Sequence, residues 1–151
     1  PLLELISQGK RVYACCGDIY SNFNWDEFEK FHDTHNNPIS ILSANSFPAK
    51  KAACFNIASN GSVKSWKRKI KSSKKDYINI GAYIIDPDPE LIEIAKELLK
   101  NKACKEDVFF QKCIEKRILS AYKETSFSCN INTPDIYNRL VKRIIKNNRK
   151  P

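Results

Sequence analysis

The 151-residue sequence contains no methionine, only four glycines and no long apolar run. A membrane-spanning helix needs about 18 consecutive apolar residues, so no such span is predicted. The sequence also lacks the charged and apolar regions of a secretory signal, which predicts a cytoplasmic protein. Translation starts at methionine, whereas this chain starts at Pro1 with a short helix-like segment that Gly9 stops. We therefore expect a part of a longer protein, unless only the initiator methionine was removed.

The spacing of the six cysteines excludes the common zinc-binding patterns. They stand at positions 15, 16, 54, 104, 113 and 129, so no two are separated by two residues. Neither His32 nor His35 has a cysteine at zinc-finger spacing. We expect the cysteines to be reduced and mostly buried as small hydrophobic residues, with Cys15 and Cys16 in a core strand.

Positive charge is abundant and unevenly distributed. The chain has 26 lysines and arginines against 17 acidic residues, for a net charge of +9. The excess lies in residues 64–75 and in the tail, residues 142–150. Such runs can bind phosphates, but residues 67–75 contain no aromatic side chain to stack on bases, which disfavours nucleic acid as a partner. The alternative is a solvated loop and a frayed helix end.

Helix-like and strand-like segments alternate along the chain, which predicts one α/β domain over residues 1–151. Asn24, Asp88 and Thr133 can each cap a helix, and a further short helix is predicted over residues 105–115. Asn60-Gly61 between two strand-like runs predicts a hairpin, followed by a basic loop. Strands are expected at residues 12–16, 39–42, 52–57, 62–66, 77–85, 118–122 and 127–129. The last helix is expected to face inward with Ile136, Tyr137, Leu140, Val141, Ile144 and Ile145.

Gly17-Asp18 follows the apolar run at residues 12–16. This pattern predicts a strand that ends with a carboxylate at the carboxyl edge of a sheet, where open α/β sheets bind ligands. Glycine permits a sharp turn and the close approach of a ligand. Aspartate there can hold Mg²⁺ against phosphate oxygens. The alternative is a turn aspartate that caps the next segment.

Five short motifs occur in order along almost the whole chain. They occupy residues 17–23, residues 60–63 leading to 66–69, and residues 79–86, 106–109 and 130–137. In this order they resemble the sugar-1-phosphate nucleotidyltransferases, and most closely the branch that acts on mannose-1-phosphate or heptose-1-phosphate. The resemblance implies a Rossmann-like α/β/α nucleotidyltransferase fold with a mixed sheet. It also implies that this fold is incomplete at the amino terminus, because the family's glycine-rich nucleotide loop would precede Pro1.

The resemblance also implies a reaction. Such an enzyme transfers a nucleoside monophosphate from a nucleoside triphosphate to a sugar 1-phosphate and releases pyrophosphate, in nucleotide-sugar biosynthesis. The chemistry needs a divalent cation and basic groups rather than a covalent nucleophile. By resemblance, Asp18 and Lys69 are the catalytic residues, and Mg²⁺ is the cofactor with Asp18 and Asn130 as its ligands. The residues that bind substrate by resemblance are Gly17, Lys69, Asn79, Gly81 and Glu106.

Three positions depart from the family's pattern. Asn130 replaces an acidic metal ligand, and Arg68 replaces a glutamate. Strict register places Lys105 where the family has a glutamate, so Glu106 serves only if the register slips by one. These departures support the alternative of a truncated or decayed, non-catalytic domain that binds sugar phosphate or nucleic acid. Without the glycine-rich loop to hold the triphosphate, the chain alone is expected to be inactive.

Two of these site residues also have a purely structural interpretation. Asn130 is either a metal ligand or a turn residue. The run Asn79-Ile80-Gly81 either contacts the sugar or marks a bulge in a central strand. The sequence predicts neither the sugar, the base nor the oligomeric state.

Overall fold

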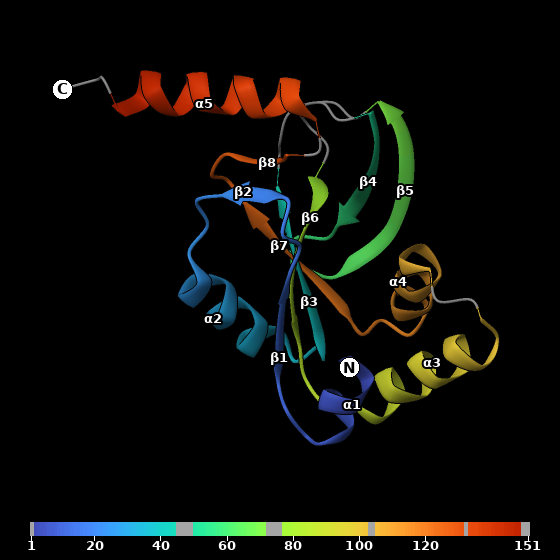
Figure 1. The fold of residues 1–151 in the computed structure, drawn as a ribbon. Helices are drawn as coiled ribbons and strands as arrows, with labels where there is room; N and C mark the ends of the chain where they lie inside the picture. Colours follow the sequence, from blue (N-terminus) through green and yellow to red (C-terminus); the bar gives the residue numbers. More distant parts are fainter. Residues whose placement is uncertain (1, 45–49, 72–76, 103–104, 132, 149–151) are drawn as a thin grey trace.

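A mixed β-sheet organises the chain in the computed structural model, which describes residues 2–44, 50–71, 77–102, 105–131 and 133–148 (Figure 1). Five strands follow the order β5-β4-β6-β3-β7, and β1 pairs with β6 outside this path. β3 and β7 are parallel, whereas the other pairs are antiparallel. These strands are β1 (Val12–Cys15), β3 (Ile39–Ala44), β4 (Lys50–Ile57), β5 (Val63–Lys71), β6 (Tyr77–Ile85) and β7 (Leu119–Glu124).

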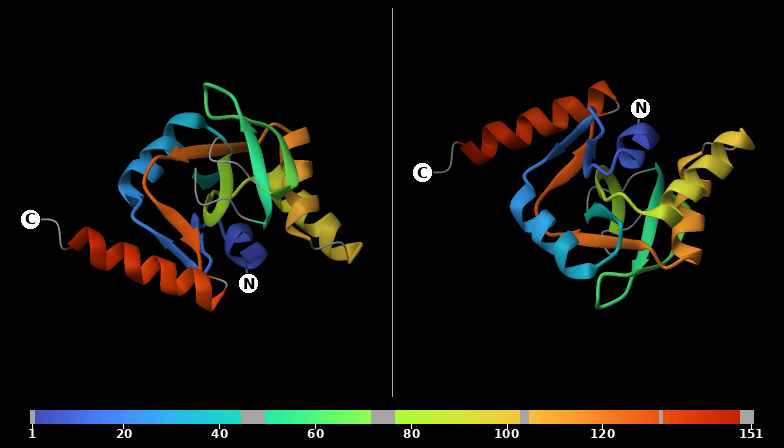
Figure 2. Two further views of the ribbon diagram at one scale, coloured as in Figure 1. Left: turned by 90° about the horizontal axis from the view of Figure 1, so that it is seen from above. Right: turned by 90° about the horizontal axis from the view of Figure 1, so that it is seen from below.

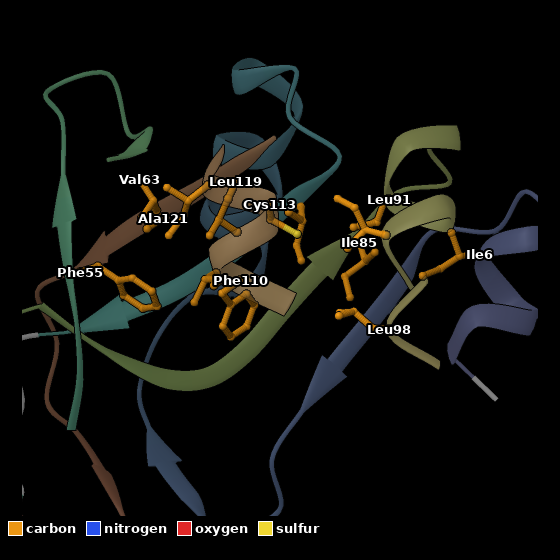
Figure 3. Packing of buried hydrophobic residues seen from close by; sticks show 14 residues of the cluster. Ile6, Phe55, Val63, Ile85, Leu91, Leu98, Phe110, Cys113, Leu119 and Ala121 are labelled. Atoms are coloured by element: carbon orange, nitrogen blue, oxygen red, sulfur yellow. The ribbon is translucent and has the colours of Figure 1, made fainter. Parts of the chain in front are cut away.

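Helices cover both faces of this sheet (Figure 2). On one face, Phe28 packs on Leu42, Ile80 and Ile84. On the other face the helices contribute a larger cluster, which includes Leu91 (Figure 3). Burying each such leucine or phenylalanine stabilises the fold by roughly 1.5–3 kcal/mol. The helices are α1 (Leu2–Ser7), α3 (Pro89–Lys100) and α4 (Glu106–Glu115) on this second face, and α2 (Trp25–His35) on the first. The predicted α/β/α arrangement with a mixed sheet is confirmed.

A small two-stranded sheet and the last helix complete the structure. β2 (Ile19–Ser21) pairs with β8 (Ser128–Asn130) in antiparallel fashion, and α5 (Pro134–Asn148) follows. α5 lies beside β8 and its last turns extend past the body (Figure 1). Only Leu140 of its apolar side is fully buried, whereas Tyr137 and Ile145 are 55% and 45% exposed. The expectation that all its apolar residues face inward is therefore wrong, because one side of this helix packs on the body and the adjacent apolar side does not.

Local capping agrees with the sequence prediction. Asn24 accepts a hydrogen bond from the N–H of Asp26 (2.9 Å), and Asp88 accepts one from the N–H of Leu91 (2.9 Å). Thr133 likewise accepts a bond from the N–H group three residues further along. Each bond satisfies a backbone donor that the first turn of a helix leaves unpaired. The predicted helix starts are confirmed. Among the described residues, none of the helices has the length and apolar character needed to cross a membrane.

Two expectations about the strands are wrong. Residues 67–71 of the basic run extend β5 rather than form a loop, because this segment pairs with β4. β5 is an edge strand, and its lysines disfavour pairing with a strand of another molecule. Cys15 and Cys16 are exposed, because β1 pairs with β6 alone and is not a core strand. Cys54, Cys113 and Cys129 are buried as expected, and Cys104 lies outside the described residues.

A polar network joins the ends of several elements. Arg11, just before β1, donates to both carboxylate oxygens of Asp86, which follows β6, over 2.5 and 2.9 Å. The buried ring of His32 lies 3.1 Å from the same carboxylate through Nε2 and 2.8 Å from the hydroxyl of Ser40 through Nδ1. Arg11 holds the pKa of Asp86 below its usual value, whereas burial lowers the pKa of His32 despite the neighbouring carboxylate.

This network predicts that acid destabilises the fold. The pKa of His32 is lower in the folded state than the value of about 6.5 in an unfolded chain, so the unfolded state binds the proton more readily. The contribution of His32 to stability is therefore fully present above about pH 6.5 and is lost as the pH drops below this value. The lowered pKa of Asp86 removes further stability below about pH 4. Urea unfolding of the wild type and of His32→Gln at pH 5–7.5 measures the contribution of His32.

We expect His32→Gln to be less stable than the wild type at pH 7.5, because it disturbs a buried network. It should nevertheless lose less of its stability on acidification to pH 5. A wild-type pH dependence in this variant would show that other groups control the response to acid.

Candidate functional site

A bulge in the middle of β6 organises the candidate site. In the pairing with β3, Ile41 lies opposite Tyr83 while Ser43 lies opposite Asn79, so β6 contains extra residues at this point. Gly81 has a φ of 75°, and its N–H donates to the side-chain oxygen of Asn79 over 2.8 Å. The structural alternative left open for this run, a bulge in a central strand, is therefore present. Because a bulge can redirect a side chain, it does not exclude a binding role for Asn79.

Gly81 lets another segment cross close to β6. A Cβ atom at this position would lie 2.7 Å from both the Cys16 sulfur and the Ile19 side chain. The N–H of Cys16 also donates to the carbonyl oxygen of Gly81 over 2.8 Å. The missing side chain at Gly81 thus makes room for the segment that contains Asp18.

Three polar side chains meet beside the bulge, and we call them the polar trio: Asn79, Tyr83 and Glu106. The Asn79 amide donates to the Tyr83 hydroxyl (2.9 Å) and to Oε1 of Glu106 (3.0 Å). The Tyr83 hydroxyl donates to the same Glu106 oxygen over 2.7 Å. Burial and the Glu106 carboxylate raise the pKa of Tyr83, which keeps it a neutral donor. The structure thus brings Asn79, Gly81 and Glu106 together from β6 and α4.

The trio settles which residue faces Asn79. Lys105, the residue in strict register with the family's glutamate, is the N-cap position of α4 and its side chain makes no capping bond. Glu106 begins the helix and reaches the bulge. That Glu106 takes the place of the family's glutamate stays a prediction.

Asp18 lies in the turn between β1 and β2, not at the end of a central strand. β3 occupies one edge of β6, so β4 and β1 share the other edge, and β1 pairs there only with residues 82–85. The expectation that Gly17-Asp18 ends a buried central strand is wrong, because β1 lies beside half of β6 and has exposed residues. Gly17 is exposed, and a Cβ atom there would meet nothing within 4 Å.

The backbone places Asp18 next to Asn130. Ile19 pairs with Asn130 in the β2–β8 sheet, and the N–H of Ile131 donates to the carbonyl oxygen of Asp18 over 2.6 Å. The side chain of Asn130 is outside the part of the chain that the structure describes. Whether it meets the exposed Asp18 carboxylate stays a prediction.

Electrostatics link Asp18 to the polar trio through Cys16. Cys16 is exposed as a residue, but neighbouring atoms partly desolvate its thiol, and this is the main cause that raises its pKa; the negative charges of Asp18 and Glu106 raise the pKa further. Both carboxylates therefore act on one thiol beside Gly81. Neither Cys16 nor Tyr83 was among the site residues predicted from the sequence. Tyr83 could have been found, because residues four apart in a strand lie on the same face.

Lys69 is placed by its backbone alone. It lies in β5 opposite Ala52, and its side chain is not among the described atoms. The register across β5, β4 and β6 aligns Lys67 with Cys54 and Cys54 with Ile78. Lys69 lies two residues further along β5 than Lys67, which places its backbone level with the start of the bulge in β6. Two strand spacings, about 10 Å, separate the two backbones there. A long lysine side chain can bridge part of this separation, and convergence of Lys69 with Asn79 remains a prediction.

A graded glycine series tests the crossing at Gly81. Gly17→Ala should change the free energy of unfolding by less than about 0.5 kcal/mol, because the added methyl group meets open space. Gly9→Ala, with φ of 74° and equally open space, should lose about 1 kcal/mol from backbone strain. Gly81→Ala combines the same strain with two close contacts and should lose about 2–4 kcal/mol. Urea unfolding measures all three, and equal losses at Gly9 and Gly81 would contradict the crossing.

The comparisons with known proteins identify the fold. No protein-family model and no curated protein sequence matches the chain. A Bacillus anthracis protein described as a glucose-1-phosphate thymidylyltransferase, solved with sucrose, matches with a TM-score of 0.70 at 14% identity, over 91% of this chain and 56% of that chain. HddC from Yersinia pseudotuberculosis matches with a TM-score of 0.62 at 14% identity, over 95% and 60%. Its complex with GMP-PN gives a TM-score of 0.59 at the same identity.

These likenesses show a shared fold. The chain has the mixed α/β architecture of sugar-phosphate nucleotidyltransferases. It spans 56–60% of the length of the solved structures that it matches.

Proposed function

We propose that the chain is the sugar-phosphate-binding portion of a sugar-phosphate nucleotidyltransferase. The observation that supports this most is the polar trio beside the segment that contains Asp18, within a fold shared with such enzymes. The solved neighbours include complexes with a sugar, sucrose, and with a nucleotide, GMP-PN. A sugar 1-phosphate and a nucleoside triphosphate are accordingly the proposed substrates, and a mannose or heptose phosphate is the first to test.

Glu106 and Asn79 are suited to bind sugar hydroxyls. Oε1 of Glu106 accepts from both Asn79 and Tyr83, which fixes the orientation of the carboxylate. Among the described residues, Oε2 of Glu106 has no hydrogen-bond partner and can accept a bond from a hydroxyl. The Asn79 amide can both donate and accept. The trio therefore presents an acceptor whose direction is set before the ligand arrives.

Asp18 is the proposed protein ligand of Mg²⁺, with Asn130 beside it. Among the described residues, no group of three or more His, Cys, Asp or Glu side chains could hold a metal ion by itself. One exposed carboxylate still fits magnesium, because this ion is often held by one or two carboxylates together with substrate phosphates. When bound, Mg²⁺ would supply positive charge at the phosphate oxygens. Lys69 is proposed to neutralise the sugar phosphate from the other side.

A non-catalytic sugar-phosphate-binding domain is the second candidate. Arg68 and Asn130 stand where the family has acidic residues, which lowers the negative charge available for a metal. The polar trio does not depend on these two positions. Sugar binding is therefore compatible with either candidate. Because the chain alone is expected to be inactive without a glycine-rich nucleotide loop, pyrophosphate release with Mg²⁺ distinguishes the candidates only in a protein that includes such a loop.

Binding of mannose-1-phosphate tests the polar trio. We expect Glu106→Ala and Asn79→Ala each to weaken binding about 10-fold, because a hydrogen bond to a charged group contributes roughly 1.5–3 kcal/mol. The matched control is Glu115→Ala, which removes an exposed carboxylate from the other end of α4. Isothermal titration calorimetry measures the affinities, and thermal unfolding checks that each variant is folded. Unchanged affinity in both trio variants, in a folded protein, would remove the trio from the site.

A second prediction separates a specific phosphate contact from diffuse positive charge. Lys69→Ala should weaken mannose-1-phosphate binding more than Lys74→Ala, although both remove one charge from the same basic run. Binding of free mannose should hardly change in either variant, because it has no phosphate. Calorimetric titrations with both ligands measure this. Equal effects of the two substitutions would mean that only the overall charge of the run matters.

A further inference from the structure

A concave site lies away from the polar trio. It is a pocket of about 670 Å³ lined by the turn between β4 and β5 and by residues at the end of α4. Glu106 begins α4, whereas Arg117 follows its last residue, Glu115. A helix rises 1.5 Å per residue, so the two ends are about 15 Å apart. The pocket and the polar trio therefore lie at opposite ends of α4.

The lining of this pocket combines an apolar floor with two positive charges. Val63, Ile114 and Leu119 are buried and form the floor, and Val63 lies beside Leu119 in Figure 3. Lys64 and Arg117 line the pocket and are exposed. Neither cation forms an ion pair within the described part of the chain, and no acidic residue lines the pocket. We call this site the cation pocket.

Arg117 occupies a backbone position that favours glycine. Its φ is 60°, and α4 ends with the N–H of Arg117 bonded to the carbonyl oxygen of Ile114 and that of Ile118 bonded to the carbonyl oxygen of Cys113, each over 3.0 Å. This is the hydrogen-bond pattern in which glycine commonly ends a helix. An arginine here is strained, and strained residues are frequent at functional sites. This turn fixes the backbone from which Arg117 lines the pocket.

We propose that the cation pocket binds a phosphate monoester with a flat apolar group. The phosphate would meet the guanidinium of Arg117 and the ammonium of Lys64, which can form charge-assisted hydrogen bonds. The apolar group would lie on the floor, as in small-molecule sites that combine an apolar lining with a few polar anchors. Ser62 and Asn60 at the rim offer further polar groups. This site is separate from the proposed sugar-phosphate site and does not depend on that function.

Phenyl phosphate is the probe, because it joins one phosphate to one aromatic ring. Inorganic phosphate and phenol each supply one half of it, and benzoate replaces the phosphate by a carboxylate. Calorimetry or ligand-detected NMR on the wild type should show phenyl phosphate binding at least 10-fold more tightly than any of the three. Equal binding of inorganic phosphate would overturn the apolar part of the site, and equal binding of benzoate would overturn the assignment of a phosphate.

Arg117→Gly separates binding from folding. Glycine relieves the strain at φ 60°, so this variant should unfold about 2–4 °C higher than the wild type while binding phenyl phosphate at least 10-fold more weakly. The matched control is Lys102→Gly, because Lys102 follows α3 with a φ of 51° and does not line the pocket. It should gain similar stability and retain wild-type binding. Lys64→Ala should also lose affinity.

Two further results would contradict the proposal. One is wild-type affinity for phenyl phosphate in Arg117→Gly and Lys64→Ala. The other is loss of phenyl phosphate binding in Glu106→Ala, which would place the probe at the polar trio instead. We expect Glu106→Ala to bind phenyl phosphate as the wild type does, whatever its effect on mannose-1-phosphate, so that the two proposals can fail separately.

Discussion

The bulge at residues 79–81 is the constraint on which the arrangement of the sheet depends. β3 pairs along one edge of β6, while the other edge changes partner from β4 before the bulge to β1 after it. This change is possible because Gly81 adopts a positive φ and has no side chain, so that Cys16 can approach it closely. A side chain at Gly81 would separate the two segments. The position of the Asp18 turn relative to β6 therefore follows from one backbone conformation.

The same bulge organises the proposed binding site. Asn79 uses its oxygen to hold the bulge and its amide to hold Glu106, so one side chain links the backbone of β6 to the start of α4. Cys16 and Ile19, which flank the Asp18 turn, lie against Gly81, whose N–H is held by Asn79, so the turn lies beside the bulge. The proposed site has two carboxylates, and Lys69 would add the positive charge that phosphate chemistry needs more than it needs a nucleophile. α4 then separates this site from the cation pocket at its far end.

Features that depend on neighbouring residues were predictable from the sequence. Asn24 and Asp88 cap their helices as expected, because the acceptor and the donor lie within three residues of each other. Asn60-Gly61 forms the predicted hairpin for the same reason. Features that depend on distant partners were not. The burial of Cys15 and Cys16 was misjudged because it depends on where β1 pairs, and residues 67–71 extend the predicted strand because β4 lies alongside.

By itself, the sequence determined the alternation of elements, their starts and the residue types from which a phosphate site can be built. Periodicity and capping act over a few residues, so a single chain segment contains their whole cause. Only the tertiary structure decided that Glu106 rather than Lys105 meets Asn79, that Tyr83 joins them, and that Arg117 lines a separate pocket. Asn79 and Glu106 are 27 residues apart, and a shift of one residue at a helix start changes which side chain arrives. Packing selects that shift, because the helix must bury Phe110 and Ile114 against the sheet, and this orients every other residue of α4.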